Sequence, residues 1–159
     1  MKFKTPFYAV MKAVNRALQE NESGTEWFDG SAEIPEIESF FQDQSEFSYG
    51  IIGASEADTL PNMDMEIWEM TVELEVYSNY KGKKVIAQTL EALLNYLCTK
   101  KAWILLQTEL KEEKFQLVDM HVGKLRINLP IFSDKGTWQS GGTNVTFRVG
   151  HIKDKKKEV

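Results

Sequence analysis

The chain has 159 residues, of which 42% are hydrophobic and 27% charged, a composition typical of a globular domain that buries roughly 70% of its unfolded surface. Its single cysteine, Cys98, excludes an internal disulfide framework and a structural zinc held by paired cysteines. Residues 1–20 do not form a signal peptide, and no apolar run approaches the roughly 20 residues of a membrane span, so we expect a soluble intracellular protein.

The net charge of −5 conceals a strong asymmetry along the chain. Residues 1–16 hold four Lys and Arg and no acid, whereas residues 17–80 hold sixteen acids and no Lys or Arg. Residues 81–159 hold fifteen Lys and Arg against eight acids. Chance and solubility are the simplest explanation. Alternatively, an acidic and a basic patch on one body would favour head-to-tail association, and an acidic wall would repel nucleic acid.

In chain order, Thr5-Pro6 predicts the start of a helix, and Gly24 predicts its end. Residues 20–46 are acidic and irregular, with enough apolar side chains for a short strand or an extended arm. Residues 47–58 predict a buried strand in which Gly50 and Gly53 mark close packing or a bulge. A loop and a strand at 67–77 follow, and the two strands would form a hairpin.

In the second half, residues 84–100 predict an amphipathic helix whose apolar stripe is Ile86, Leu90, Leu93, Leu94 and Leu97. Residues 103–109, "WILLQTE", predict a strand, as do the alternating residues 114–122 and the last strand at 143–152. Residues 124–132 would add a short extended piece. Turns are expected at residues 134–136 and at Ser140-Gly141-Gly142.

This order of elements predicts an α+β fold, with two helices packed on one face of a mostly antiparallel β-sheet. We expect one domain over residues 1–152, which includes the irregular arm at 20–46. Residues 153–159, "KDKKKEV", predict a charged, disordered tail.

The strand at 67–77 raises the main functional question. Its residues alternate strictly, so Met70, Val72 and their neighbours face the core while Glu69, Glu73 and Glu75 share the other face. A catalytic acid cluster, a cation site, a binding surface and a solvated face are all compatible with three carboxylates. The sequence offers them no histidine or basic partner nearby, and metal sites draw ligands from several elements, which favours a surface over a reaction site.

Other candidate chemistry is equally sparse. There is no G-x-S-x-G motif, and Cys98 follows an apolar helical stripe, where a buried, inert thiol is expected. Asp119 and His121 would share a strand face, but a metal site needs three or four ligands. "GIIGAS" (50–55) lacks the residues of a phosphate-binding loop. We therefore expect no enzyme activity, no cofactor and no metal.

A basic cluster, Lys81, Lys83 and Lys84, opens the second helix and could contact phosphate or an acidic protein. Solvation alone would also explain three lysines in a turn. The sequence pI near 5.2 argues against a dedicated nucleic-acid binder.

Over about residues 5–150, the chain resembles the tail-completion or tail-terminator proteins of long-tailed bacteriophages and prophages. The resemblance lies in an N-terminal helix, an irregular arm, "YGIIGASEAD", "LEVYSNYKGKK", the helix "VIAQTLEALLNYL" and a final strand, "TNVTFRV". The longer arm at 20–46, the glycines at 141–142 and the lysine tail depart from the usual pattern.

The resemblance implies a structural virion protein that forms a ring, a hexamer, at the head-proximal end of the tail. Such a ring stops polymerisation of the tail tube, joins the tail to the head connector and lets DNA pass through its lumen. Its partners would be other copies of itself, the tail-tube protein and the head connector proteins, with no membrane involved. It would be found in the host cytoplasm during assembly and in the virion afterwards.

This resemblance suggests that Glu69, Glu73 and Glu75 face the lumen or a subunit seam, although a solvated outer face would explain them equally well. Lys81, Lys83 and Lys84 are candidates for partner contact. Three alternatives stay open: another connector or minor structural phage protein, a non-viral acidic adaptor that binds a basic peptide, and a metal-dependent hydrolase that uses Asp119, His121 and the strand glutamates.

Overall fold

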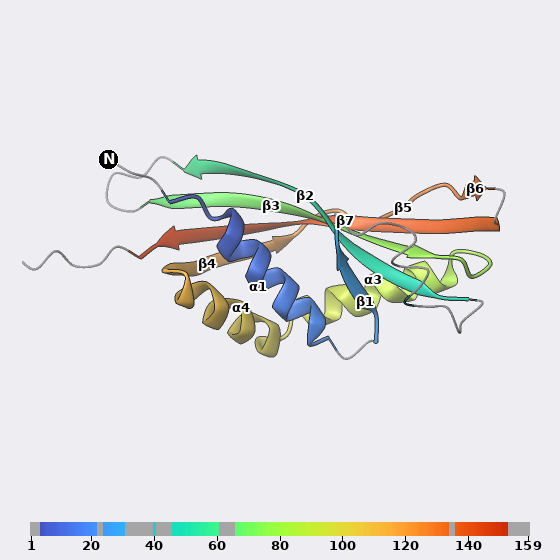
Figure 1. Ribbon diagram of the computed structural model, residues 1–159, viewed down its shortest axis with the longest axis horizontal. Helices are drawn as coiled ribbons and strands as arrows, with labels where there is room; N and C mark the ends of the chain where they lie inside the picture. The colour runs from blue at the N-terminus through green and yellow to red at the C-terminus, as the bar shows by residue number, and fades with distance from the viewer. Residues whose placement is uncertain are drawn as a thin grey trace, which may run out of the picture.

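The computed structural model describes residues 4–21, 24–30, 40, 46–60, 66–133 and 136–152, and it has the predicted α+β architecture (Figure 1). The helices of these described ranges are α1 (Phe7–Gln19), α3 (Lys84–Leu97) and α4 (Lys100–Glu112). The strands are β1 (Glu26–Asp29), β2 (Ser48–Leu60), β3 (Ile67–Ser78), β4 (Phe115–Val122), β5 (Arg126–Ile127), β6 (Ile131–Ser133) and β7 (Gly136–His151).

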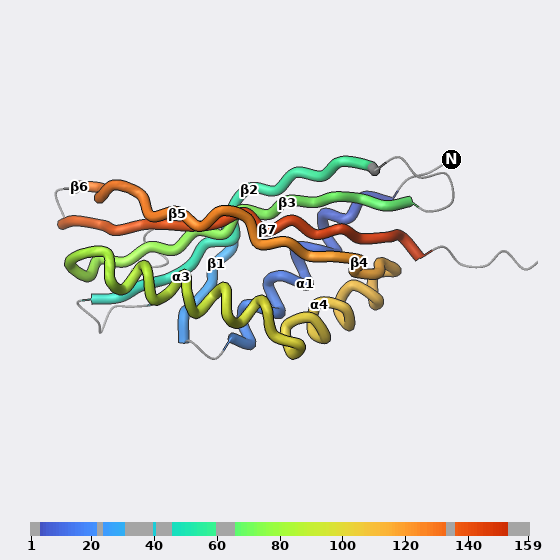
Figure 2. The backbone as a smooth tube through the Cα atoms, turned by 180° about the vertical axis from the view of Figure 1, so that it is seen from behind, coloured from blue at the N-terminus to red at the C-terminus, as the bar shows by residue number. Residues whose placement is uncertain are grey.

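The strands form one long sheet in the order β1-β2-β3-β7-β4. Strands β4, β5 and β6 follow one another along the same edge of β7, as the backbone trace shows (Figure 2). Among the described strands only the β1–β2 pair is parallel, so the sheet is mostly antiparallel as predicted, and β2 and β3 pair as the expected hairpin. The β1–β2 side and the β4–β6 side are therefore the two opposite edges of the sheet.

All three of these helices lie on one face of the sheet (Figures 1 and 2). The expected number of two helices was wrong, because "WILLQTE" belongs to α4 rather than to a strand. Thr99 caps this helix by accepting a hydrogen bond from the backbone N–H of Ala102. Its buried residues, Ala102, Leu106 and Leu110, recur every four positions, which is the spacing of a helix rather than a strand.

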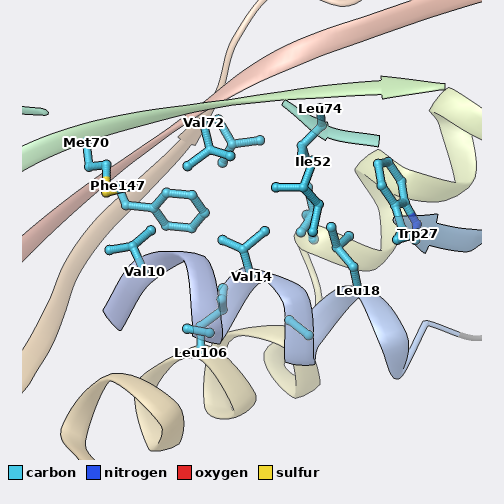
Figure 3. Packing of buried hydrophobic residues seen from close by; sticks show 14 of the residues in the cluster. Val10, Val14, Leu18, Trp27, Ile52, Met70, Val72, Leu74, Leu106 and Phe147 are labelled. Carbon is cyan, nitrogen blue, oxygen red and sulfur yellow. The ribbon is translucent and has the colours of Figure 1, made fainter. Parts of the chain in front are cut away.

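The core lies between the three helices and the sheet, and Figure 3 shows its part beneath α1 and α4. Val10, Val14 and Leu18 of α1 point toward side chains of β3 and β7, and Phe147 lies between the helix and the sheet. The strict alternation of β3 predicts five inward residues, of which Met70, Val72, Leu74 and Val76 are buried, while Trp68 is half-buried and packs against the core. Val145, Phe147 and Val149 of β7 are buried as predicted.

The glycines at 141 and 142 do not form the expected turn, because both lie within β7. They are needed where other backbones approach the strand closely. A Cβ at Gly141 would lie 2.6 Å from the carbonyl oxygen of Arg126, and a Cβ at Gly142 would lie 2.5 Å from that of Leu74. Glycine permits this close approach as well as it permits turns, so the sequence pattern alone favoured the wrong structure.

Gly50 and Gly53 of β2 confirm the prediction of close packing and a bulge. A Cβ at Gly50 would lie 2.4 Å from the ring of Trp27, which packs flat on the strand. The register between β2 and β3 shifts between Ile52 and Ser55, the stretch that contains Gly53. The strand is buried only in part, since the residues after this shift are half-buried or exposed.

Strand β4 does not keep the single alternation that the sequence suggested. Phe115 and Leu117 are buried, but the register to β7 shifts before Asp119, and from there Met120 and Val122 pack against the core. Asp119 is therefore exposed on the opposite face of the sheet. A bulge inserts one residue and reverses which side chains face inward.

Several predicted boundaries shift or lie outside the described residues. Helix α1 follows Pro6 as N-cap and ends at Gln19, so Gly24, although its φ is 77°, is too far along to cap it. Within the irregular arm, residues 26–29 form β1, while residues 31–39 and 41–45 are not described. The predicted tail at 153–159 and most of the turn at 134–136 also lie outside the described residues.

Candidate functional site

The three candidate glutamates of β3 lie on the face of the sheet that carries no helix. Glu69, Glu73 and Glu75 are half-buried, and they alternate with the buried residues that face α1 and α3. The structure thus places the three carboxylates together on one face, as the strict alternation predicted.

The expected absence of basic partners was wrong. Arg126 lies 3.2 Å from a carboxylate oxygen of Glu73 and 3.1 Å from one of Glu75. Arg148 donates a hydrogen bond of 3.2 Å from Nε to Glu69. Both arginines come from the basic block of the sequence, so the fold interleaves the acidic and basic blocks on this face.

Gly142 explains how Arg126 reaches across the sheet. Arg126 of β5 lies opposite Gly142 of β7, and Gly142 lies opposite Glu75 of β3. A Cβ at Gly142 would lie 3.2 Å from the guanidinium of Arg126. Because glycine carries no side chain, the arginine can cross β7 and bridge Glu73 and Glu75.

The bridged carboxylates titrate differently. A hydrogen bond with Glu75, together with burial, raises the pKa of Glu73 above its usual value, although Arg126 opposes this rise. Burial alone would raise the pKa of Glu75, but hydrogen bonds from Glu73 and Tyr77 and the charge of Arg126 lower it overall. Burial and the bond to Glu75 raise the pKa of Tyr77 well above its ordinary range. The two carboxyl groups can therefore share one proton beneath Arg126.

Two polar hollows flank β3 and β7 on this face. One, of about 280 Å³, contains Asp119 and His121, which share a face as predicted. Its remaining lining residues are Glu69, Thr146 and Arg148. A second hollow, of about 200 Å³, is lined by Ala54, Ser55, Glu56, Thr71, Glu73 and Asn144.

The hydrolase alternative needs a metal held by several of these residues. Within the described ranges, no group of three or more His, Cys, Asp or Glu residues is arranged to hold a metal ion. His151 lies elsewhere, with its Nδ1 3.5 Å from the buried carboxylate of Glu66. The geometry of the described residues thus gives the hydrolase hypothesis no ligand set.

The basic candidates lie apart from the glutamates. Lys81, Lys83 and Lys84 are exposed at the start of α3, and Gly82 turns the chain with a φ of 79°. The start of α3 lies at the same end of the molecule as β6 (Figures 1 and 2). The structure therefore gathers these lysines near β6 but does not bring them to the β3 glutamates.

Cys98 is exposed, so the expectation of a buried thiol was wrong. It follows Leu97, the last buried residue of α3, and occupies the C-cap position, where the chain turns toward α4. The preceding stripe is confirmed for Ile86, Leu90, Leu93 and Leu97, whereas Leu94 is only half-buried.

Sequence reasoning missed an exposed apolar segment. Residues 125–132, here called the apolar ribbon, carry five exposed large hydrophobic side chains, namely Leu125, Ile127, Leu129, Ile131 and Phe132. The alternation "LRINL" was visible in the sequence, but it suggested an ordinary half-buried strand. Exposed apolar patches of this kind are rare in monomers and mark interaction surfaces.

The comparisons with known proteins assign no family to the chain. No protein-family model matches the sequence, and no curated protein matches it. No helix within the described residues is long and apolar enough to cross a membrane.

Proposed function

We propose that the chain is a structural protein of a phage tail, of the tail-terminator type, which assembles into a ring at the head-proximal end of the tail tube. In this role it stops tube polymerisation, joins the tail to the head connector and encloses a lumen through which DNA passes. The proposal rests on the sequence resemblance, since the chain matches no family model or curated protein.

The observation that best supports an assembly role is the apolar ribbon. Leu129 is 82% exposed and Phe132 is 79% exposed, and both belong to a segment that is fixed to the sheet by pairing with β7. A chain that worked alone would leave this apolar surface in water, which costs free energy and invites aggregation. A subunit of a ring would bury it.

The helix-free face suits a lumen or a seam better than it suits catalysis. It presents paired carboxylates and arginines rather than a basic surface, and DNA phosphates bind most strongly where cations are unpaired. We propose that Glu69, Glu73 and Glu75 face the lumen or a subunit seam. The protein would then work by surface complementarity and without enzyme activity, metal or cofactor.

The location of the chain in a particle tests this proposal. An epitope tag after residue 159 would be added to the chain in its own genome, and released particles would be labelled with gold-conjugated antibody. We expect label at the junction of head and tail and on the head-proximal end of free tails. Label on the distal tip, label on the capsid shell, or no labelled particle would contradict the proposal.

A further inference from the structure

The apolar ribbon is held rigidly to its own sheet by its polar residues. Arg126 reaches Glu73 and Glu75, and the backbone and side chain of Asn128 bond to Ser140 at 2.9 and 3.0 Å. The ribbon therefore keeps one conformation before it meets a partner. A preorganised segment loses little conformational entropy on binding, which favours its use as a docking element.

The apolar side chains of the ribbon project from the sheet instead of packing on it. Ile127 lies opposite Gly141, and Phe132 lies opposite Thr137, both at positions of β7 that face the helices. The register shifts by one residue between these two pairs, and Leu129 lies in this irregular stretch. Leu129 and Phe132 are the two most exposed apolar side chains of the ribbon.

The opposite edge of the sheet offers a complementary hollow, here called the α1–β2 groove. Its volume is about 350 Å³, and it lies between α1 and the strands β1 and β2. Its lining residues are Tyr8, Met11, Lys12, Asn15, Asp29 and Ile52. Tyr8 is 70% exposed, so the apolar part of the groove is open to a partner.

The ribbon cannot fill the groove of its own chain. The groove lies at the β1–β2 edge of the sheet, and the ribbon runs along the β4–β6 edge. In both views β6 lies at one end of the sheet, away from α1 (Figures 1 and 2). Two different surfaces on opposite edges of one body produce a head-to-tail contact between copies, which closes into a ring when the rotation allows.

Charge favours a second copy of the chain over another occupant. The ribbon and the neighbouring start of α3 carry four exposed lysines, Lys81, Lys83, Lys84 and Lys124, against one exposed acid nearby, Glu46, and residues 120–133 contain no acid. The groove edge carries four exposed acids, Glu26, Asp29, Glu56 and Asp58. Lys12 within the groove is already held by Glu112 and Glu113 at 3.1 and 3.2 Å.

The backbone of β2 gives the same edge a second means of contact. Strand β1 pairs with β2 only over residues 49–52, so no other strand of the described ranges pairs with residues 55–60 on that side. An unpaired strand edge readily accepts an extended segment from another chain. The ribbon is such a segment. Its strands β5 and β6 pair with β7 on one side, and among the described strands no strand pairs with them on the other side.

We propose that the apolar ribbon of one copy docks into the α1–β2 groove of a neighbouring copy, with Leu129 and Phe132 as anchors and Tyr8 as their main contact. This inference rests on the proposed ring-forming function and names the two surfaces of its seam. It also assigns Lys81, Lys83 and Lys84 to the acidic edge of the neighbour rather than to nucleic acid.

Native mass spectrometry of the full chain and its variants tests the inference. The ribbon variant Leu129→Asp/Phe132→Asp and the groove variant Tyr8→Asp should each be monomeric, with self-association weakened about 30-fold or more, as when an interface anchor is lost. The matched control Ile104→Asp changes a residue of α4 that is 52% exposed and should keep the oligomer of the wild type. Circular dichroism would establish that every variant is folded.

Mixing the two monomeric variants provides the sharper test. The groove variant keeps an intact ribbon and the ribbon variant keeps an intact groove, so the mixture should form a heterodimer and nothing larger. A wild type that stays monomeric, a ribbon variant that keeps the wild-type mass, or a mixture without heterodimer would overturn the inference. An intact ring in the ribbon variant would leave the ring-forming role standing, because another surface would then form the seam.

Discussion

At the scale of single residues, Gly142 determines how closely three chain segments meet. Replacing it with alanine would push a Cβ against the carbonyl oxygen of Leu74 and crowd the guanidinium of Arg126. We expect Gly142→Ala to lower the free energy of unfolding by about 1–3 kcal/mol, as is typical of overpacking. Urea denaturation would measure this loss.

The matched control is Gly53→Ala, a strand glycine whose added Cβ would meet its nearest atom, the carbonyl oxygen of Glu73, only at 3.4 Å. That change should leave the free energy of unfolding within about 0.5 kcal/mol of the wild type. Equal losses in the two variants would show that glycine at 142 does not serve the close approach.

The shared proton of Glu73 and Glu75 predicts a dependence on pH. Because the pKa of Glu73 is raised above 4.5 in the folded protein, its contribution favours folding below that pH and is lost as the pH rises through the folded value. The side-chain amide of a Glu73→Gln variant would donate the same hydrogen bond at every pH. The free energy of unfolding of this variant, minus that of the wild type, should therefore increase as the pH rises from 4.5 through the raised pKa of Glu73.

Urea titrations from pH 4 to pH 8 would measure this difference, with Glu91→Gln on the exposed face of α3 as the control. A difference that is constant, or that decreases as the pH rises, would contradict the shared proton. The pair itself could not be predicted from sequence, since Arg126 is 51 residues from Glu75 and only the fold brings them together.

At the scale of elements, α4 shows why a short apolar run is ambiguous. In a strand, Ile104 and Leu106 would point to the same side, but in a helix two residues apart they face different ways. In the structure Leu106 is 1% exposed and Ile104 is 52% exposed. Leu106→Ala should cost about 2–5 kcal/mol of unfolding free energy, and Ile104→Ala should cost less than about 0.5 kcal/mol. Thermal and urea unfolding of both variants would check this, and similar losses would contradict the helix.

Strongly periodic elements were the ones that sequence predicted well. The strict alternation of β3 and the stripe of α3 each extend over enough residues to exclude the other structure. The place of Gly141 and Gly142 within β7 and the reversed alternation after the bulge in β4 were missed, because both depend on contacts with neighbouring strands. For the same reason, the sequence identified the three glutamates but not their arginines.

At the scale of the whole molecule, the charge blocks of the sequence do not become separate poles on the helix-free face. Arginines from the basic block pair with Glu69, Glu73 and Glu75 there, so this face is a mixed network. The exposed acids of β1 and β2 and the lysines at the start of α3 remain at different places on the surface. These two groups of described residues keep the opposite charges that the sequence suggested for two separate patches.

Reversing the charge of the β3 glutamates tests their proposed place in the lumen or seam. The triple variant Glu69→Lys, Glu73→Lys and Glu75→Lys would set three lysines beside Arg126 and Arg148, so we expect a weaker ring or slower DNA passage. Oligomer mass and phage infectivity would measure the two effects. The control reverses Glu91, an exposed glutamate of α3 that belongs to neither proposed seam surface, and should be close to wild type. If the β3 variant also keeps infectivity and oligomer size, this assignment is wrong.

We propose that the chain ends a tail tube and joins it to a head. The most direct test of this proposal is deletion of the coding sequence from the genome, followed by electron microscopy of the particles and measurement of tail lengths. We predict tails of variable, excessive length and separate, DNA-filled heads, with normal particles restored when the chain is supplied from a plasmid. Tails of normal, uniform length attached to heads in the deletion strain would contradict this proposed function.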